Sequence, residues 1–499
     1  MTVFILMVVI FVLGYTVIAL EHPLKINKSA TALFIGMFLW LLMAAYNQQI
    51  VEINASPLFN ELKEMSEDIV KYIKPNVDQE HYKKLWEEKA ILTQDSPEHN
   101  HYMEFVKYAL GEHLNDIAQI LFFLLGAMTI VETVDRYQGF RIITDRIKTK
   151  NPVKLIWLLS FLTFFMSAAL DNLTTTIVMI ALLRKLVPDQ KLRWFFASLI
   201  VIAANAGGAW SPIGDVTTIM LWINGNITTV EIILGVFIPS LMSMIIPLIF
   251  VSMMLRKTTI GEQKLDGSQL QPVQTSPREQ VLLLVLGVGG LLFVPVLKTL
   301  THLPPYVGML FSLSIVWITT EILVRRKIKY DPNRSQLSIE RILSHVDVPT
   351  IFFFLGILMA VAALETAGHL DLLAKWLDKV THTNLYIIDA AIGLLSSIVD
   401  NVPLTAAAMG MYPIADPATA VGVMKHFVQD GLFWELLAYT AGTGGSILII
   451  GSAAGVAAMG LEKIDFIWYA KKITWLAALG YFAGIITYWL QESVFHILH

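Results

Sequence analysis

Cysteine is absent from the 499 residues, which excludes disulfides, thiolate metal sites and cysteine nucleophiles. Charge is scarce as well: Asp, Glu, Lys and Arg make up 15% of the chain, whereas a soluble protein of this length carries roughly 25%. The Lys and Arg residues form short clusters between apolar blocks, and the net charge is only -4, so no basic stripe points to nucleic acid. These absences disfavour a soluble globular protein.

Hydrophobic residues make up 55% of the chain and gather in blocks. Most blocks lack the polar face of a soluble amphipathic helix, and they approach or exceed the ~18–20 residues that cross a bilayer. The blocks are residues 1–20, 29–46, 117–134, 230–255, 281–296, 305–324, 349–364 and 473–490. The sequence therefore predicts an all-α polytopic membrane protein. Because the first block lacks a basic start and a small-residue cleavage site, we expect a retained span there.

Basic residues predict the orientation, because Lys and Arg collect in cytoplasmic loops. Of 36 basic residues, 25 fall in six stretches that should therefore be cytoplasmic, namely 21–28, 135–154, 184–193, 256–278, 325–341 and 463–472. Two of these stretches flank the apolar segment 155–183, whose 29 residues must therefore begin and end on the same side. Two crossings of about 14 residues would reach only ~21 Å of a ~30 Å core. The pattern predicts a re-entrant hairpin from the cytoplasm, with its tip near residues 167–172.

A second segment, 385–412, lies between stretches that are poor in Lys and Arg. It predicts a hairpin from the outer face, with its tip near residues 396–401. With about ten full spans and these two hairpins, every basic loop is cytoplasmic and both termini are extracytoplasmic.

The two halves of the chain share landmarks in the same order, which predicts two repeats of inverted topology. The stretch FFLLG at 122–126 resembles FFFLG at 352–356; an Asp-Asn pair follows each, with Asn172 46 residues after the first glycine and Asn401 45 after the second. We expect residues 1–255 to form the first repeat, with an extracytoplasmic insertion at about 48–112. Residues 256–280 should be a cytoplasmic linker, and residues 281–499 the second repeat.

Each repeat also contains a segment of about 30 residues, 194–223 and 431–461, which is too long for one straight crossing. Glycine and proline are expected to interrupt these helices at 205–215 and 440–452. Such backbone is tolerated at membrane depth only where it is buried in protein or lines a polar cavity. Two hairpin tips and two interrupted helices should therefore converge on one polar site.

Carboxylates inside these segments are the first candidates for that site, because an intramembrane charge is costly and functional by default. No Lys or Arg occurs in 155–183, 194–255, 385–412 or 431–461, and the surrounding donors are neutral oxygens, which suit a hard cation. A carboxylate satisfied by neighbouring amides is the alternative, and many Ser and Thr in spans only bond their own helix. The expected cation- and proton-binding residues are Asp171, Asn172, Asp400, Asn401, Asp215, Asn205, Thr217, Thr218, Ser446, Thr443, Ser211, Ser167 and Ser396, with Asp171 and Asp400 as ligands of Na+. Further oxygen donors nearby are Thr174, Thr175, Thr176, Ser397, Thr405 and Ser452.

A proton and a cation would compete for these carboxylates, because the ligand form must be deprotonated. If the site binds Na+ on one side of the membrane, releases it on the other and returns with a proton, the result is exchange. Movement of one helix bundle against another would expose the site to the two sides in turn.

Four stretches resemble a known family: SAALDNLTTT at 167–176, NAGGAWSPIGDVTT at 205–218, DNVPLTAA at 400–407 and TGGS at 443–446. Together with FFLLGAMTIVE at 122–132, they are similar to the NhaD-type sodium/proton antiporters of the ion transporter superfamily. The resemblance implies a dimer, export of Na+ or Li+ against proton entry, and no enzymatic activity or cofactor. It also implies an integral membrane protein, which we expect in the bacterial inner membrane, in contact with lipid.

Three other readings stay open from the residues. A Na+-coupled carboxylate or other anion transporter of the same superfamily would hold its substrate against aspartates with no compensating base. An intramembrane aspartyl protease would use Gly-x-Gly-Asp, but the sequence before Asp215 is Pro-Ile-Gly. A cation channel would conduct without exchange.

Overall fold

The computed structural model describes residues 2–19, 26–47, 49–50, 101–144, 147, 149, 151–256, 275–328 and 331–493, and the predicted insertion falls largely outside them. The described residues are helical and contain no strand. Eight of their helices are long and apolar enough to cross a membrane, or nine if α23 and α24, which are bent by 52° at their junction, count as one. The chain is therefore an integral membrane protein of the all-α class.

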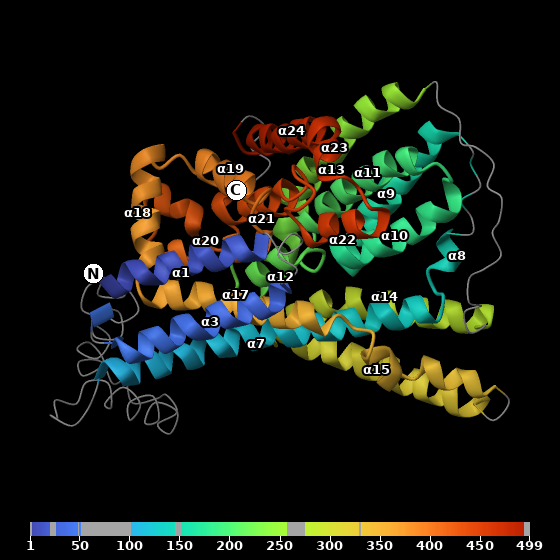
Figure 1. Cartoon of the computed structure of the whole chain (residues 1–499), viewed down its shortest axis with the longest axis horizontal. Helices are drawn as coiled ribbons and strands as arrows, with labels where there is room; N and C mark the ends of the chain where they lie inside the picture. Colours follow the sequence, from blue (N-terminus) through green and yellow to red (C-terminus); the bar gives the residue numbers. More distant parts are fainter. Residues whose placement is uncertain are drawn as a thin grey trace. The chain divides into compact units, whose positions relative to one another are not determined.

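The chain divides into two compact units, each of which gathers segments distant in sequence. The first unit comprises residues 1–118, 348–382 and 406–413, and the second comprises 119–347, 383–405 and 414–499. Helices α7 (His101–Arg136) and α20 (Asn401–Met411) contribute to both (Figure 1).

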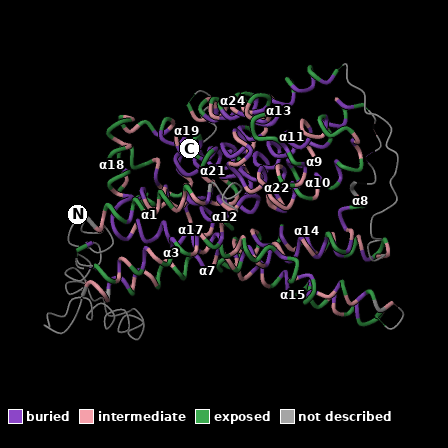
Figure 2. Tube along the Cα trace, in the orientation of Figure 1, coloured by how far each residue is buried: buried purple, intermediate pink, exposed green. Residues whose placement is uncertain are grey.

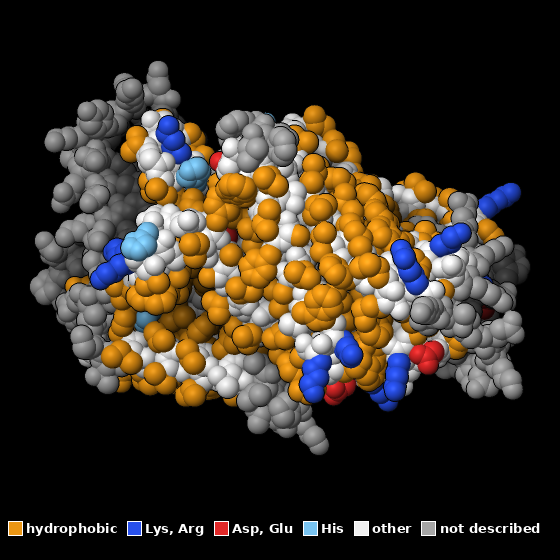
Figure 3. Space-filling model, turned by 90° about the horizontal axis from the view of Figure 1, so that it is seen from above, with side chains coloured by type: hydrophobic (Ala, Val, Ile, Leu, Met, Phe, Trp, Pro, Cys, Tyr) orange, Lys and Arg blue, Asp and Glu red, His pale blue; other side chains and the backbone are white. Residues whose placement is uncertain are grey.

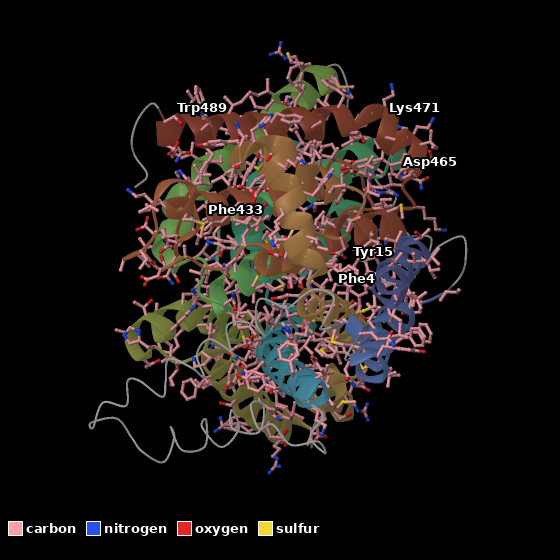
Figure 4. All side chains as sticks on the ribbon, turned by 90° about the vertical axis from the view of Figure 1, so that its left-hand side faces the viewer. Phe4, Tyr15, Phe433, Asp465, Lys471 and Trp489 are labelled. Carbon is pink, nitrogen blue, oxygen red and sulfur yellow. The ribbon has the colours of Figure 1, made fainter. Side chains whose placement is uncertain are left out.

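The first unit holds α1 (Thr2–Ala19), α3 (Lys28–Ala45), α17 (Val348–Thr366) and α18 (His369–Thr381). Helix α3 packs closely on α17 at Gly36, where an added Cβ would overlap the carbonyl oxygen of Gly356. The absence of a side chain at Gly36 permits this approach of the two backbones. The Trp40 indole then donates a hydrogen bond of 2.9 Å to the carbonyl oxygen of Met359. Phe4, labelled in Figure 4, stacks on His369 and so joins α1 to α18.

The second unit is built around two buried helices, α11 (Gln190–Ala209) and α21 (Leu432–Gly444), which pack against each other. Every residue of α21 and every residue from 196 to 209 of α11 is buried. Figure 2 shows the region around these two helices mostly in the colour of buried residues. Their neighbours include α9 (Pro152–Leu170), α10 (Asn172–Leu186), α12 (Val216–Ile223), α13 (Thr229–Leu255), α19 (Leu385–Leu395), α22 (Ala453–Glu462) and α24 (Thr474–Ser493). The other elements of the unit are α8 (Arg141–Thr144), α14 (Pro277–Thr301), α15 (Pro305–Lys327), η1 (Pro332–Leu337), α16 (Ile339–Leu343), η2 (Gly422–Phe427) and α23 (Phe466–Lys472).

Helices α13 and α24 pack against each other and present apolar side chains outward. Hydrophobic side chains cover most of the face seen in Figure 3, which looks down on these two helices. Lys471 and Trp489 lie toward opposite ends of the α23–α24 pair (Figure 4). An apolar band with a basic residue at one end and an aromatic residue at the other is typical of a lipid-facing helix.

The helix breaks lie within the predicted regions but are shorter than predicted. Helix α11 continues through Gly207 and Gly208 to Ala209, and α12 begins at Val216. Helix α21 continues to Gly444, and α22 begins at Ala453. Gly214, Gly445 and Gly451 lie in the breaks, as predicted, whereas Gly207, Gly208, Gly442 and Gly444 are helical. Gly207 and Gly444 serve close helix packing instead.

Close packing at these glycines follows the same pattern twice. A Cβ at Gly207 of α11 would overlap the carbonyl oxygen of Phe164 in α9. A Cβ at Gly444 of α21 would overlap the carbonyl oxygen of Gly393 in α19. Phe164 and Gly393 each lie seven residues before an Asp-Asn pair.

Two serines repeat the correspondence with hydrogen bonds. Ser167 donates 2.6 Å to the carbonyl oxygen of Ala204, and Ser396 donates 2.8 Å to that of Ala441. Each serine lies four residues before its Asp-Asn pair, and each acceptor lies three residues before the helical glycine. Matching contacts therefore fix the segment before each Asp-Asn pair to a central helix, α11 in one case and α21 in the other.

Several helices extend beyond the predicted apolar blocks. Helix α7 begins at His101, whereas the predicted block begins at residue 117. Helix α14 begins at Pro277 instead of residue 281, because Ser276 and Glu279 form a capping box with proline at the first helical position. Helix α9 begins at Pro152 and has 19 residues, so it is by itself long enough to count among the candidate spans, unlike the 14-residue arm we predicted.

A buried ion pair joins α22 to α10 and α11. The Glu462 carboxylate, 1% exposed, accepts from Arg184 Nε at 2.7 Å and from Arg193 Nε at 2.8 Å. Removing one member of a buried pair leaves the other uncompensated. Glu462→Gln should therefore destabilise the fold by about 2–3 kcal/mol, less than a fully buried pair would because Arg184 is half exposed.

Chemical denaturation or thermal unfolding in detergent measures this effect. Glu321→Gln is the matched control, because Glu321 pairs with Arg325 at 2.8 Å on an exposed surface and should change stability by less than about 0.5 kcal/mol. Equal stability of the two variants would contradict a structural role for the Glu462 pair.

Candidate functional site

Asp215 is the hub of a buried polar cluster in the second unit. It lies at the break between α11 and α12, is 1% exposed, and caps α12. Its Oδ1 accepts from the backbone N–H and the hydroxyl of Thr217, both at 3.0 Å. Thr218 completes the cap, donating from its hydroxyl to the Asp215 carbonyl oxygen at 2.9 Å. The carboxylate is thus held at the helix N-terminus, where the helix dipole favours negative charge.

Both Asp-Asn pairs send their asparagine to this carboxylate. Asn172 Nδ2 donates to Asp215 Oδ2 at 2.5 Å, and Asn401 Nδ2 donates to both carboxylate oxygens at 3.3 Å. Asn172 begins α10 and Asn401 begins α20, so two helix starts meet at one carboxylate. The amides of Asn172 and Asn401, which are 229 residues apart in the chain, are thus brought together at Asp215.

Asn205 links this carboxylate to the second broken helix. Its Oδ1 accepts from Asn172 Nδ2 at 3.1 Å, and its Nδ2 donates to the hydroxyls of Ser446 and Ser452, both at 2.9 Å. Asn205 is fully buried. The cluster therefore joins the starts of α10 and α20 to both helix breaks through neutral amide and hydroxyl groups around one carboxylate.

Asp171 and Asp400 directly precede α10 and α20 and turn their side chains to those helices. Asp171 accepts from the Thr174 N–H at 2.7 Å and the Thr174 hydroxyl at 2.8 Å, and Asp400 accepts from the Val402 N–H at 3.3 Å. Both are only partly buried, and both lie near enough to Asp215 for their charges to interact with it. Asp171 also has a φ of 89°, a strained backbone conformation for a side chain other than glycine.

The remaining predicted hydroxyls donate to backbone carbonyl groups. Ser211 donates to the Ala168 carbonyl oxygen at 2.6 Å, and Thr443 donates to the Tyr439 carbonyl oxygen at 2.6 Å. Ser167 and Ser396 bind Ala204 and Ala441, as described above. Ser167, Ser396 and Ser211 thereby join segments that are distant in sequence, whereas Thr443 bonds within its own helix, the alternative that stays open for hydroxyls in spans.

Ser452 is a member of the cluster that was not among the selected site residues. It caps α22 by accepting from the Gly455 N–H at 3.1 Å. The signal was present in the sequence: Gly451-Ser452 occupies the place in the second half that Gly214-Asp215 occupies in the first. Glu462, Asp389 and Glu435 were also passed over, although each is a single acid at or near an apolar segment.

Among the residues that the structure describes, no group of three or more His, Cys, Asp or Glu side chains is arranged as a metal site. The cluster instead offers one fully buried carboxylate with amide and hydroxyl groups around it. Rotating an asparagine amide by 180° exchanges its donor for its acceptor. The same side chains can therefore stabilise the empty carboxylate or present oxygens to a small cation.

Comparison with known proteins gives a consistent picture. The family model described as citrate transporter matches residues 2–441. A protein named sodium/proton antiporter 2 from Arabidopsis thaliana is 39% identical over 97% of this chain and 98% of its own length. Sodium/proton antiporter 1 of the same plant is 48% identical over 75% of this chain, and the match spans 62% of its length. The Na+/H+ antiporter NhaD of Vibrio parahaemolyticus is 33% identical over 77% of this chain and 92% of its own length.

Proposed function

The chain belongs to the family described as citrate transporter and, within its matched relatives, to the NhaD-type sodium/proton antiporters, and from this membership we propose that it exchanges cytoplasmic Na+ for external protons. The observation that carries the proposal is the cluster at Asp215, where both tips and both helix breaks meet. A carboxylate surrounded by neutral oxygens suits a small hard cation or a proton, and binding of one displaces the other.

We place the ion at Asp215, with the amides of Asn172, Asn205 and Asn401 turning their oxygens toward it. Asp171 and Asp400 then add negative charge beside the ion, or bind it directly after a change of rotamer. Li+ has the same chemistry and is the expected second substrate.

The matching contacts of the two halves support an inverted repeat in which α9–α10 and α19–α20 are re-entrant hairpins. The basic loops between the helices support cytoplasmic placement of 135–154 and 184–193, with both termini extracytoplasmic. Alternating access by movement of one bundle, and assembly as a dimer, stay predictions that follow from the resemblance.

The name of the matching family supports a second candidate, a Na+-coupled carboxylate transporter. A bound carboxylate would favour free helix N-termini or a basic side chain. Here the N-termini of α10 and α12 are occupied by the carboxylates of Asp171 and Asp215, and 155–183, 194–255, 385–412 and 431–461 contain no Lys or Arg. The chemistry of these segments therefore favours a cation over an anion.

Flux into proteoliposomes tests the proposal. With an imposed pH gradient, addition of Na+ or Li+ should move the lumenal pH, and K+ should do so much less. Between about pH 6 and 9, a cation and a proton can compete for a buried carboxylate. The absence of cation-dependent proton movement over this range would reject the antiporter.

Asp171→Asn and Asp400→Asn should each reduce the exchange by about 100-fold or more. A unit charge 4 Å from an ion contributes about 4 kcal/mol at a protein-like dielectric, and asparagine removes it while keeping the shape. The initial rate of Na+-dependent proton movement measures the effect, and the melting temperature in detergent checks the fold. Rates like those of the wild type in both variants would remove these residues from the site.

A further inference from the structure

Asp389 is a buried acid that the cluster at Asp215 does not use. It lies in α19, is 0% exposed, and neither of its carboxyl oxygens has a hydrogen-bond partner among the described residues. An ionised carboxylate without donors in an apolar setting costs several kcal/mol. The geometry therefore fits a carboxyl that carries a proton in this conformation.

Asp389 stands between the surface and the second tip on one face of α19. Tyr386, Asp389, Gly393 and Ser396 are spaced by three, four and three residues, so they follow one side of the helix to its C-terminal end. At the outer end, the Tyr386 hydroxyl donates to Glu492 Oε2 at 3.0 Å, and both residues are partly exposed. At the inner end, Ser396 lies four residues before Asp400.

The titratable groups that face Asp389 are hydroxyls. Tyr481 of α24 donates to the Ala390 carbonyl oxygen at 2.9 Å and interacts electrostatically with Asp389, as does Tyr386 on the same helix. From α21, Tyr439 donates to the Tyr481 carbonyl oxygen at 2.8 Å. These groups can pass or receive a proton but supply no positive charge that would hold Asp389 ionised.

The acid at this position belongs to one half only. Asp389 lies 11 residues before Asp400, and the residue 11 before Asp171 is Ser160. Ser160 is 1% exposed, and its hydroxyl, like the Asp389 carboxyl, has no hydrogen-bond partner among the described residues. The α19 hairpin therefore carries a proton-binding group where the α9 hairpin carries a neutral one.

We propose that Asp389 is a proton relay between the extracytoplasmic surface and Asp400 at the tip of the second hairpin. The net step is a transfer of one proton toward the tip. The O–H bond of Asp389 breaks, the hydroxyls of Tyr481, which lies against Gly393, and of Ser396 each give up a proton as they take one, and an O–H bond forms on the Asp400 carboxylate. Asp389 then regains a proton from the surface by way of Tyr386, whose hydroxyl gives its proton to Asp389 and is refilled from the Glu492 side. No charge is left behind once Asp389 is reprotonated. The inference rests on the proposed antiport.

The test compares two kinds of flux in the same proteoliposomes. Asp389→Asn keeps the shape of the side chain but cannot relay a proton, so Na+ transport driven by a pH gradient should fall about 100-fold, the lower end of what a positioned proton-transfer group contributes. Exchange of Na+ for labelled Na+ without a gradient needs no proton and should stay within twofold of wild type. Asp389→Ser, which copies the first half, should behave like Asp389→Asn, and Ser160→Ala is the control expected to leave both fluxes unchanged.

Each other outcome has a defined meaning. Equal proton-coupled rates in wild type and in Asp389→Asn across the pH range would overturn the relay. Loss of both fluxes in both Asp389 variants would show that Asp389 supports the fold instead, and would overturn it too. If the wild type itself shows Na+/Na+ exchange but no proton movement, the proposed antiport fails, independently of Asp389.

Discussion

Replacing Asp215 with asparagine is expected to abolish Na+-dependent proton movement. The carboxylate accepts hydrogen bonds from Thr217, Asn172 and Asn401 and is the only fully buried charge of the cluster. Asparagine would keep the size but remove the charge, and the loss of about 4 kcal/mol of attraction for an ion at 4 Å corresponds to more than 100-fold in affinity. Binding of Na+ by the purified protein, followed by calorimetry, measures this directly.

Asp465→Asn is a control that distinguishes loss of the ion site from loss of a helix N-cap. Asp465 caps α23 by accepting from the Trp468 N–H at 2.7 Å, as Asp215 caps α12, but it lies on the surface (Figure 4). Both substitutions should cost at most about 1 kcal/mol of cap stability. Only Asp215→Asn should lose Na+ binding, and Na+ binding retained by that variant would show that the ion is held elsewhere.

Alanine at Gly207 or Gly444 is expected to prevent the second unit from packing. The added Cβ would overlap a backbone carbonyl oxygen, Phe164 in one case and Gly393 in the other, so a whole helix would have to move. Overpacking of this kind costs about 1–3 kcal/mol or more where flexible side chains can yield, and here the obstacle is backbone. We expect a fall in melting temperature of about 10 °C or loss of folded protein.

Gly460→Ala is the matched control for this prediction. It lies in α22 of the same unit, and a Cβ there would meet nothing within 4 Å. Alanine should be neutral or stabilising by up to about 1 kcal/mol, because it restricts the unfolded chain and favours helix. Equal melting temperatures for Gly207→Ala, Gly444→Ala and Gly460→Ala would contradict the close approach of α9 to α11 and of α19 to α21.

The class of the protein, and which of its polar residues lie close together, were largely predictable from the sequence. Long apolar blocks indicate spans by composition alone, and the asparagines of the two Asp-Asn pairs do meet, through Asp215. Gly214 lies seven residues after Gly207, and Gly451 lies seven residues after Gly444, a repeat that points to both helix breaks. These patterns are local in sequence or repeat at fixed intervals, so they can be recognised without knowing how the helices pack.

What each residue does within the site was not predictable. Asp171 and Asp400 stay the predicted sodium ligands; in this structure their side chains accept from Thr174 and Val402, and Asp215 receives the amide of Asn172. The direction in which a carboxylate turns depends on which hydrogen-bond donors lie near it. The sequence does not show which donors on other helices come close to each aspartate. The glycines of α11 and α21 were expected to unwind their helices, but the partner backbones beside them decide that they stay helical.

The most direct test of the exchange is Na+ movement against its own gradient. Proteoliposomes with equal Na+ on both sides receive a pH jump while the membrane potential is clamped, and both Na+ and citrate are followed with labelled tracers. Antiport predicts that Na+ accumulates on the acidic side, toward the source of the protons, without any requirement for citrate. Accumulation of Na+ only when citrate is present and moves with it, or no response to the pH jump, would contradict the sodium/proton exchange.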